Sequence, residues 1–268
     1  MTVSRPAPLA SMPDTIRRAI RFVLTDIDDT LTTDGKLTGN AYAALERLRA
    51  AGRIVVPVTG RPAGWCDHIA RMWPVDAVVG ENGAFYMRYD AVRRNLVRRF
   101  VVPEAERDAQ RSRIEALGRR IIAAVPGSAM ASDQHYRETD LAIDYCEDVP
   151  ALPREAVERI VELMEAEGMT AKVSSIHVNG WFGHYDKLSM TRMLLDEVHG
   201  IDLDRERATF AFAGDSPNDA PMFAYFPNAV GVANLRRFSD QLRVLPAYIT
   251  ERDAGAGFSE LVDFLLRA

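Results

Sequence analysis

Short apolar runs that end in polar residues recur along this chain, with helical patterns between them. Runs rich in β-branched and aromatic residues predict strands at 21–24, 54–58, 75–79, 209–213, 229–232 and 247–250. Apolar residues at helical spacing predict helices at 40–51, 67–73 and 259–266. This alternation predicts an α/β fold, with a parallel sheet and helices on both faces.

The middle of the chain follows a different pattern. It is rich in arginine, with expected strands at 97–102, 141–145 and 172–178 and expected helices at 104–124 and 154–167. We therefore expect residues 85–184 to form an inserted α+β cap domain. Residues 1–84 and 185–268 together would form the core domain.

Composition excludes some classes of protein. The net charge of −5 argues against a nucleic-acid binder that uses a broad basic face. The first twenty residues contain no long apolar run, so we expect neither a signal peptide nor a membrane span, and a cytoplasmic protein. Cys66 and Cys146 show no metal-binding or redox spacing and are expected to be reduced thiols.

Three carboxylates follow the first predicted strand of the core, at Asp26, Asp28 and Asp29. Like charges this close repel each other near a core, and a divalent cation such as Mg²⁺ relieves that repulsion through hard oxygen ligands. In an extended turn Asp26 and Asp28 point to the same side, so one can attack phosphorus while the other handles the leaving-group proton. The alternative is an acidic turn or a helix N-cap, and for Asp29 a turn is the better reading.

Two further segments place polar groups at strand ends. Thr59 and Gly60 follow the second core strand, where a hydroxyl and an unhindered N–H can hold phosphate oxygens, although an N-cap turn has the same sequence. After the strand at 209–213, Gly214-Asp215-Ser216-Pro217-Asn218-Asp219 offers metal ligands, with an Asx turn and N-cap as the alternative. In a parallel sheet these strand ends lie on one rim.

Lysine is rare, at positions 36, 172 and 187 only. Lys187 precedes a helical pattern at 188–198, where a cation opposes the helix dipole. Helix stabilisation therefore does not explain it, whereas an anionic partner would. Lys172 lies in an alternating segment and is expected to be solvated.

The order of these motifs, DIDDTL at Asp26, TGR at Thr59, an isolated Lys187 and GDSPND at Asp215, resembles the haloacid dehalogenase-like (HAD) superfamily. The position and size of the insertion, preceded by Glu81-Asn82-Gly83-Ala84, resemble class IIB, the Cof-like phosphatases with a C2 cap. The resemblance implies a Rossmann-like core. One departure is Asp29, where many relatives carry glycine.

The resemblance also implies residue roles. Asp26 would be the nucleophile that forms an aspartyl-phosphate, and Asp28 the general acid and base. Thr59, Gly60 and Lys187 would bind the phosphoryl group. A Mg²⁺ cofactor would be held by the Asp26 carboxylate, the Asp28 main-chain oxygen and Asp215, with Asp219 reaching it through water. Asn218 and Asp219 would orient the network on the phosphate side.

In this subgroup the cap selects the substrate. His177 and Asn179 alternate on one face of a strand pattern and are candidates for binding sugar hydroxyls, with a structural role as the alternative. Arg61 is a candidate for substrate contact or for pairing with a surface acid. Trp181 and Phe182 are expected to pack in the cap core or at its hinge rather than to stack on substrate.

The expected activity is Mg²⁺-dependent hydrolysis of a small phosphorylated metabolite, and the expected class of substrate is a sugar phosphate. The alternatives are a phosphomutase of the phosphomannomutase-like type and a non-catalytic regulatory module that binds sugar phosphates. The sequence carries no sign of an oligomeric state.

Overall fold

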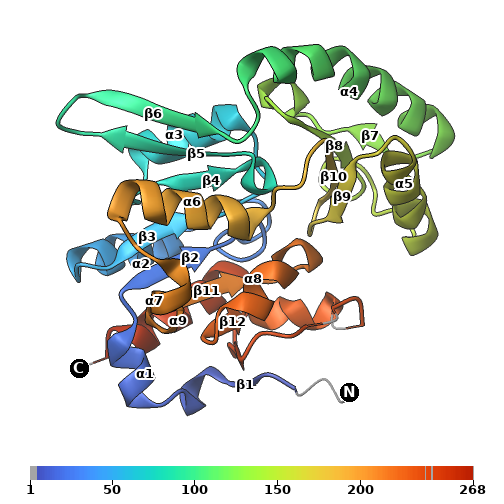
Figure 1. The fold of residues 1–268 in the computed structure, drawn as a ribbon. Coiled ribbons are helices and arrows are strands. Elements are labelled where there is room, and N and C mark those ends of the chain that lie inside the picture. The colour runs from blue at the N-terminus through green and yellow to red at the C-terminus, as the bar shows by residue number, and fades with distance from the viewer. Residues whose placement is uncertain (1–4, 239, 243, 268) are drawn as a thin grey trace.

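The computed structural model describes residues 5–238, 240–242 and 244–267. At its centre lies a six-stranded sheet in the order β1-β13-β12-β11-β2-β3, and every neighbouring pair is parallel. The strands are β1 (Ala7–Pro8), β2 (Phe22–Thr25), β3 (Ile54–Pro57), β11 (Phe210–Gly214), β12 (Ala229–Gly231) and β13 (Tyr248–Ile249). Helices cover both faces (Figure 1), which confirms the α/β class predicted from the sequence.

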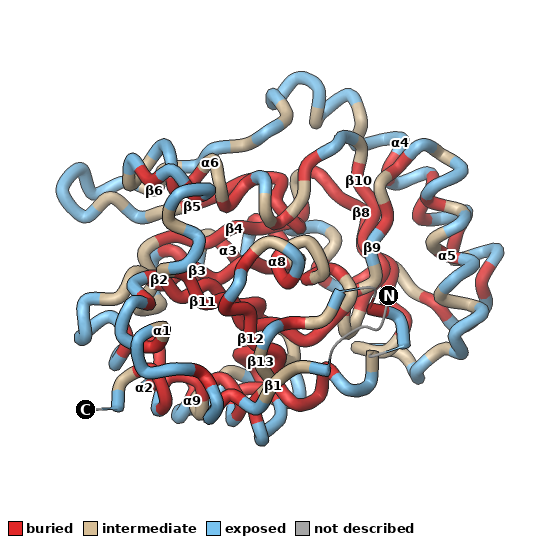
Figure 2. Tube along the Cα trace, turned by 60° about the horizontal axis from the view of Figure 1, so that its bottom comes forward, coloured by how far each residue is buried: buried red, intermediate tan, exposed pale blue. Residues whose placement is uncertain are grey.

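Each face of the central sheet has its own apolar core, because successive strand residues point to opposite sides. Phe22 and Leu24 of β2 pack in one core, in which Phe22 stacks on Phe210 with ring centroids 4.3 Å apart, and Val23 packs in the other. Figure 2 shows the central strands as buried. The first core includes side chains of α6 (Lys187–His199), α7 (Leu203–Glu206) and α8 (Ala220–Tyr225). The second includes side chains of α1 (Asp14–Ala19), α2 (Gly39–Ala50) and α9 (Ala254–Leu265).

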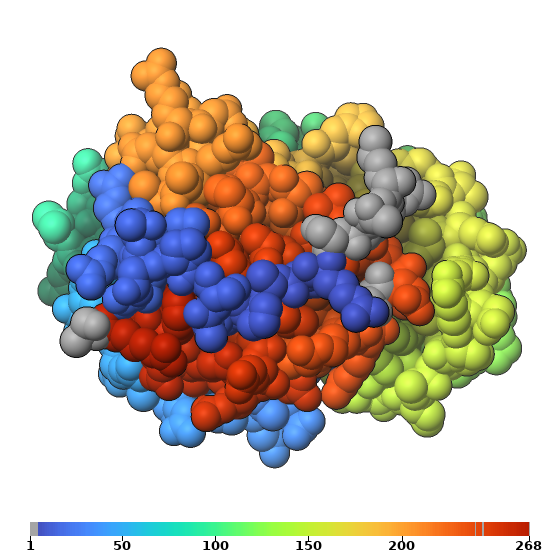
Figure 3. Space-filling model, turned by 90° about the horizontal axis from the view of Figure 1, so that it is seen from below, coloured from blue at the N-terminus to red at the C-terminus, as the bar shows by residue number. Residues whose placement is uncertain are grey.

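The N-terminal segment closes one edge of this sheet. Strand β1 pairs with β13, with Ala7 opposite Tyr248. Figure 3 shows this segment lying across the C-terminal part of the chain. Segments near the two ends of the described chain therefore pack side by side.

A second, three-stranded sheet follows β3. It consists of β4 (Val78–Gly80), β5 (Phe85–Asp90) and β6 (Asn95–Phe100) in antiparallel order, and α3 (Ala63–Met72) packs against it. A parallel bridge between Val58 and Val79 joins it to the end of β3. Since the expected boundary at residue 85 falls inside this sheet, we propose that the inserted unit begins closer to residue 104.

The inserted unit has a third sheet, antiparallel, in the order β7-β8-β10-β9. Its elements are α4 (Glu104–Ala124), β7 (Ala129–Met130), β8 (Asp140–Asp144), α5 (Arg154–Ala166), β9 (Thr170–Val173) and β10 (His177–Trp181). They enclose a separate apolar core and form the lobe that carries α4 and α5 in Figure 1. None of the helices within the described ranges has both the length and the apolar composition that a membrane crossing requires.

Some elements differ from the sequence expectation. The single strand expected at 172–178 is wrong: β9 and β10 form an antiparallel hairpin, and the Ser174 hydroxyl accepts a hydrogen bond from the His177 backbone N–H at 3.0 Å in the turn. Helix α9 begins at Ala254, five residues before the expected start at Ser259. Its glycines hide the helical pattern, but a Cβ at Gly255 would lie 2.7 Å from the Leu31 carbonyl oxygen, so close packing requires glycine there.

Candidate active site

The candidate site lies at the carboxyl ends of three adjacent strands, β11, β2 and β3. Thr25 at the end of β2 is level with Ala213 on one neighbour and Pro57 on the other. The next residues along each strand therefore meet on one rim, which brings Asp26 close to the segments that carry Thr59 and Asp215. Ligands bind at such rims in parallel sheets.

Three buried carboxylates share this rim. One carboxylate oxygen from each of Asp26, Asp215 and Asp219 lies within 4.8 Å of the other two. Burial is the main cause that raises the pKa of Asp26 to about 7. Burial, together with the nearby charges of Asp26 and Asp219, raises the pKa of Asp215 well above its usual value. A cation in the cluster would offset this repulsion, and the all-oxygen donor set fits Mg²⁺.

The cluster contains one built-in cation, Lys187. Its Nζ lies 2.8 Å from Asp26 Oδ1 and 2.8 Å from Asp219 Oδ1, and the side chain is 1% exposed. Burial lowers the pKa of Lys187, but the two carboxylates outweigh burial and raise it, so the ammonium stays charged. It is the first residue of α6, and Asp186 caps that helix by accepting the Ser189 N–H. An interaction with anions therefore explains this lysine, as expected.

Neighbouring side chains fix the orientation of Asp215. Thr30 Oγ1 donates to Asp215 Oδ1 at 3.1 Å, and Asn234 Nδ2 donates to Asp215 Oδ2 at 3.0 Å. Asn234 also donates to the Asp29 carbonyl oxygen at 2.9 Å. The sequence reading missed Asn234, although it follows the end of β12 by three residues and the rule about strand ends would have suggested it.

The backbone at Asp29 has a conformation that suits glycine. Asp29 has φ = +54°, in the left-handed region that glycine adopts most easily and that aspartate tolerates better than most residues. Burial raises the pKa of its carboxyl group. A turn role, expected for Asp29, agrees with this conformation.

The candidate phosphate cradle consists of Thr59 and Gly60 with two amides behind them. Thr59 is fully buried, and its Oγ1 accepts the Arg61 N–H at 3.0 Å. Asn218 Nδ2 donates to Asn82 Oδ1 at 3.1 Å, and a Cβ placed on Gly60 would lie 3.1 Å from Asn82 Nδ2.

Asn82 leaves a buried donor without a partner. The residue is 2% exposed, and its Nδ2 makes no hydrogen bond to any described residue. Its backbone N–H donates to the Thr59 carbonyl at 3.0 Å, and its φ of +54° holds it against the cradle. The sequence reading used this asparagine only as a family marker. An unpaired donor beside Gly60 fits an anionic ligand there.

The remaining expected catalytic residue, Asp28, is paired with Arg61. The guanidinium Nη2 lies 2.7 Å from Asp28 Oδ1 and its Nε donates to both carboxylate oxygens, at 2.9 and 3.0 Å. The same guanidinium reaches Glu147 Oε1 at 2.6 Å and Asp133 Oδ2 at 3.3 Å, both in the inserted unit. Of the two roles considered for Arg61, the ion pair is present, but it is buried and links the two units.

The two residues of the inserted unit that were expected to bind substrate have different partners. His177 Nε2 lies 2.8 Å from Glu147 Oε2, so His177 reaches the site through Glu147 and Arg61. Asn179 Nδ2 instead donates to the buried Asp140 Oδ2 at 2.9 Å. Asp140 pairs with Arg137, whose Nη1 donates to the Gly60 carbonyl oxygen at 2.8 Å, so Asn179 is connected to the candidate cradle only through two other side chains.

Comparison with known proteins agrees with this geometry. Residues 23–105 match the family described as haloacid dehalogenase-like hydrolase. No curated protein sequence matches the chain.

Solved structures share the fold along nearly the whole chain. The C-terminal domain of trehalose-6-phosphate phosphatase from C. albicans matches with a TM-score of 0.71 and 13% identity, covering 99% of each chain. A putative HAD/COF-like hydrolase from Plasmodium vivax matches at 0.66 and 16% identity, covering 93% of this chain and 98% of the other. The sucrose-phosphatase from Synechocystis sp. PCC6803 matches at 0.60 and 15%, covering 92% and 98%. Identities this low establish the fold alone.

Proposed function

We propose that this chain, which belongs to the haloacid dehalogenase-like hydrolases, is a Mg²⁺-dependent phosphatase that acts through an aspartyl-phosphate. One observation carries the proposal: the buried Lys187 ammonium lies 2.8 Å from both Asp26 and Asp219, beside Asp215. A buried lysine held against clustered carboxylates at the end of a parallel strand is suited to binding a phosphoryl group. Phosphoryl transfer requires this combination of positioning and positive charge.

Asp26 is the proposed nucleophile. Lys187 holds its Oδ1, and one carboxylate oxygen of Asp26 attacks phosphorus as the bond from phosphorus to the leaving oxygen breaks. Asp28 enters this step protonated, gives its proton to the departing alkoxide and is left as the carboxylate that pairs with Arg61. Asp28 then takes a proton from water, which attacks phosphorus and breaks the bond to Asp26, so that inorganic phosphate leaves and both side chains return to their initial states.

The metal and the cradle share the charge of the phosphoryl group. Mg²⁺ would be held by the carboxylates of Asp26 and Asp215 and the main-chain oxygen of Asp28, with Asp219 behind them, and would supply positive charge to the phosphoryl oxygens when bound. Thr59, Gly60 and Asn218, with the unpaired donor of Asn82, would hold the remaining oxygens. Lys187 would neutralise charge between Asp26 and the phosphoryl group.

The proposed substrate is a small phosphate monoester, and sugar phosphates are the first class to assay. Support comes from the fold shared with structures named trehalose-6-phosphate phosphatase and sucrose-phosphatase. The inserted unit would select among such esters, since its Asp133 and Glu147 pair with Arg61, the partner of Asp28, and its His177 pairs with Glu147.

A panel of phosphorylated sugars and nucleotides tests the proposal. Phosphate release is expected with Mg²⁺, loss of release with a chelator, and no release from a folded Asp26→Asn variant. Substantial turnover by that folded variant would remove Asp26 as nucleophile. An isomerised ester without free phosphate would replace hydrolysis with mutase activity.

A further inference from the structure

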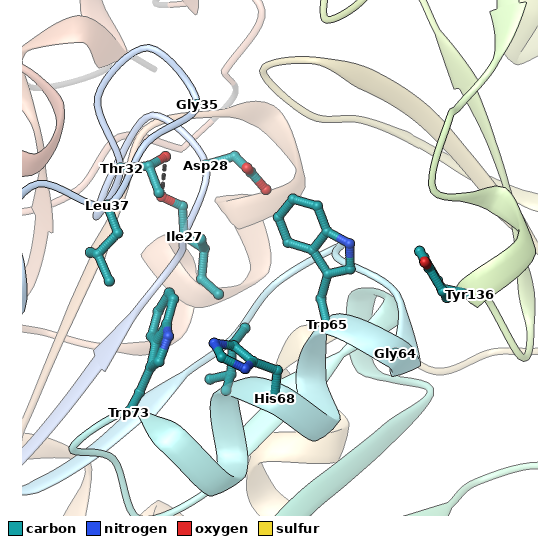
Figure 4. Close-up of a pocket in the computed structure, with 11 residues that line it drawn as sticks. Ile27, Asp28, Thr32, Gly35, Leu37, Gly64, Trp65, His68, Trp73 and Tyr136 are labelled. Carbon is teal, nitrogen blue, oxygen red and sulfur yellow. Dashed lines mark hydrogen bonds between the residues drawn. The ribbon is translucent and has the colours of Figure 1, made fainter.

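A pocket opens beside Asp28, between α3 and the loop that follows β2 (Figure 4). Its volume is about 520 Å³, and Asp28 forms part of its wall. The inserted unit contributes Tyr136 on the far side, so the pocket extends from the core to the cap. Its apolar lining consists mainly of Ile27, Leu37, Trp65, Ile69, Trp73 and Tyr136.

The wall offers few polar groups. The Thr32 hydroxyl lines the pocket but is already occupied, since it donates to the Ile27 carbonyl at 3.1 Å and accepts the Asp29 N–H at 3.2 Å. The other polar groups of the lining are Asp28, His68, the Tyr136 hydroxyl and the indole N–H groups of the two tryptophans, and most of the wall is apolar. A hydroxyl-rich group pressed against this wall would lose hydrogen bonds to water without replacement, so an apolar surface fits it better.

Trp65 is held at the junction of this pocket and the candidate catalytic centre. The Arg61 guanidinium carbon lies 4.3 Å from the centre of the Trp65 ring, and the same guanidinium pairs with Asp28. Despite this contact the residue is 41% exposed, which is high for tryptophan in a chain with a large core. The indole therefore presents a fixed, open surface next to the carboxyl group that would protonate a leaving group.

We propose that this pocket receives the leaving group of the substrate, and that the leaving group carries a ring whose flat apolar face stacks on Trp65. The inference rests on the proposed function, because the ester oxygen must lie within hydrogen-bond reach of Asp28 when it departs. An aromatic ring has such a face, and so does the C–H side of a sugar ring. Methyl phosphate has no ring to place there.

Three esters and three variants test this inference. With Mg²⁺, kcat/KM is measured for phenyl phosphate, glucose 6-phosphate and methyl phosphate in the wild type and in Trp65→Ala, Trp65→Phe and Met72→Ala. Met72 is the control, since it lies on the same helix, is 64% exposed and is outside the pocket. We expect the preferred ring ester to exceed methyl phosphate in the wild type.

Trp65→Ala is expected to lower the ratio of kcat/KM for the ring ester to kcat/KM for methyl phosphate by about fivefold to tenfold, mainly through KM. Trp65→Phe is expected to keep most of the wild-type ratio. Met72→Ala should leave the ratio unchanged. The ester with the higher ratio identifies the ring as aromatic or sugar.

A ratio that stays the same in folded Trp65→Ala while all three esters are hydrolysed overturns the pocket assignment and leaves the phosphatase intact. Failure of the wild type to hydrolyse any of the three contradicts the proposed function itself. Thermal unfolding of each variant separates these results from misfolding.

Discussion

At the scale of single residues, the site depends on which buried polar atoms have partners. Lys187 has two carboxylate partners and Asp215 has two donors, so both side chains are fixed before any ligand arrives. Asn82 differs, because its Oδ1 accepts from Asn218 while its Nδ2 is unpaired. Preorganised donors of this kind stabilise a phosphoryl group without having to move during the reaction.

Asn82→Asp isolates that donor. Aspartate keeps an acceptor for Asn218 and tolerates φ = +54°, but it replaces the free N–H donor with an anion. We expect kcat/KM to fall by at least about 10- to 100-fold, because the loss of one hydrogen bond to a charged group accounts for that much and the new carboxylate also repels the phosphoryl group. Asn218→Asp serves as the comparison, and an unchanged kcat/KM in folded Asn82→Asp would remove Asn82 from the cradle.

Several of the proposed catalytic residues were predictable, because a parallel sheet brings polar residues at strand ends together. Asp26, Thr59 and Asp215 each follow an apolar strand, and Lys187 begins a helix where a cation needs an anionic partner. The role of Asn82 escaped prediction, since an amide in a loop has many uses, whereas Asn234 was missed although its place after β12 would have suggested it. Their roles depend on contacts between distant segments.

At the scale of elements, Arg61 joins the core to the inserted unit. It follows β3, while Glu147 lies after β8. Sequence patterns could not reveal the pair, because the two residues are separated by 86 positions along the chain. Partial burial raises the pKa of Glu147, but its pairing with His177 and Arg61 outweighs burial and lowers the pKa to about 2. The contact therefore favours the ionised carboxylate in the folded protein.

This pairing predicts a pH-dependent effect of Glu147→Gln. Since the folded pKa lies below the unfolded value of about 4.5, the ionised carboxylate stabilises the fold above that pH and loses this contribution as the pH falls towards 2. Glu147→Gln should lower the midpoint temperature of unfolding at neutral pH. The difference in this temperature between the variant and the wild type should shrink in acid.

Glu158→Gln is the matched control in the same unit. Glu158 pairs with Arg154 on the surface of α5, where its side chain is 56% exposed, and such pairs contribute little. If Glu147→Gln lowers the unfolding temperature at neutral pH no more than Glu158→Gln does, the link between the units adds no stability.

At the scale of the whole molecule, the sheet concentrates negative charge at one rim and the inserted unit adds more. Asp26, Asp215 and Asp219 form the carboxylate cluster at the strand ends. Asp133 and Glu147 of the inserted unit both pair with Arg61. A cation bound among Asp26, Asp215 and Asp219 would relieve the repulsion between their charges at the end of the central strands.

Mg²⁺ alone should therefore raise the unfolding temperature. At about 100 times the dissociation constant the gain is about 2.7 kcal/mol, which corresponds to roughly 5 °C or more for a chain of this size. Asp215→Asn should remove the shift. Asp263→Asn should keep it, because Asp263 forms an exposed pair with Arg47. Equal shifts in the two variants would contradict a cation site at Asp215.

The proposed nucleophile can be observed directly by trapping the phosphorylated chain. Asp28→Asn should slow the attack of water, whereas 4-nitrophenyl phosphate has a leaving group that departs without protonation. The covalent intermediate should therefore accumulate in this variant with Mg²⁺. After an acid quench, mass spectrometry should find phosphate on the peptide that contains Asp26, and none on the double variant with Asp26→Asn. Turnover without phosphate on Asp26, or phosphate on another residue, would contradict the account.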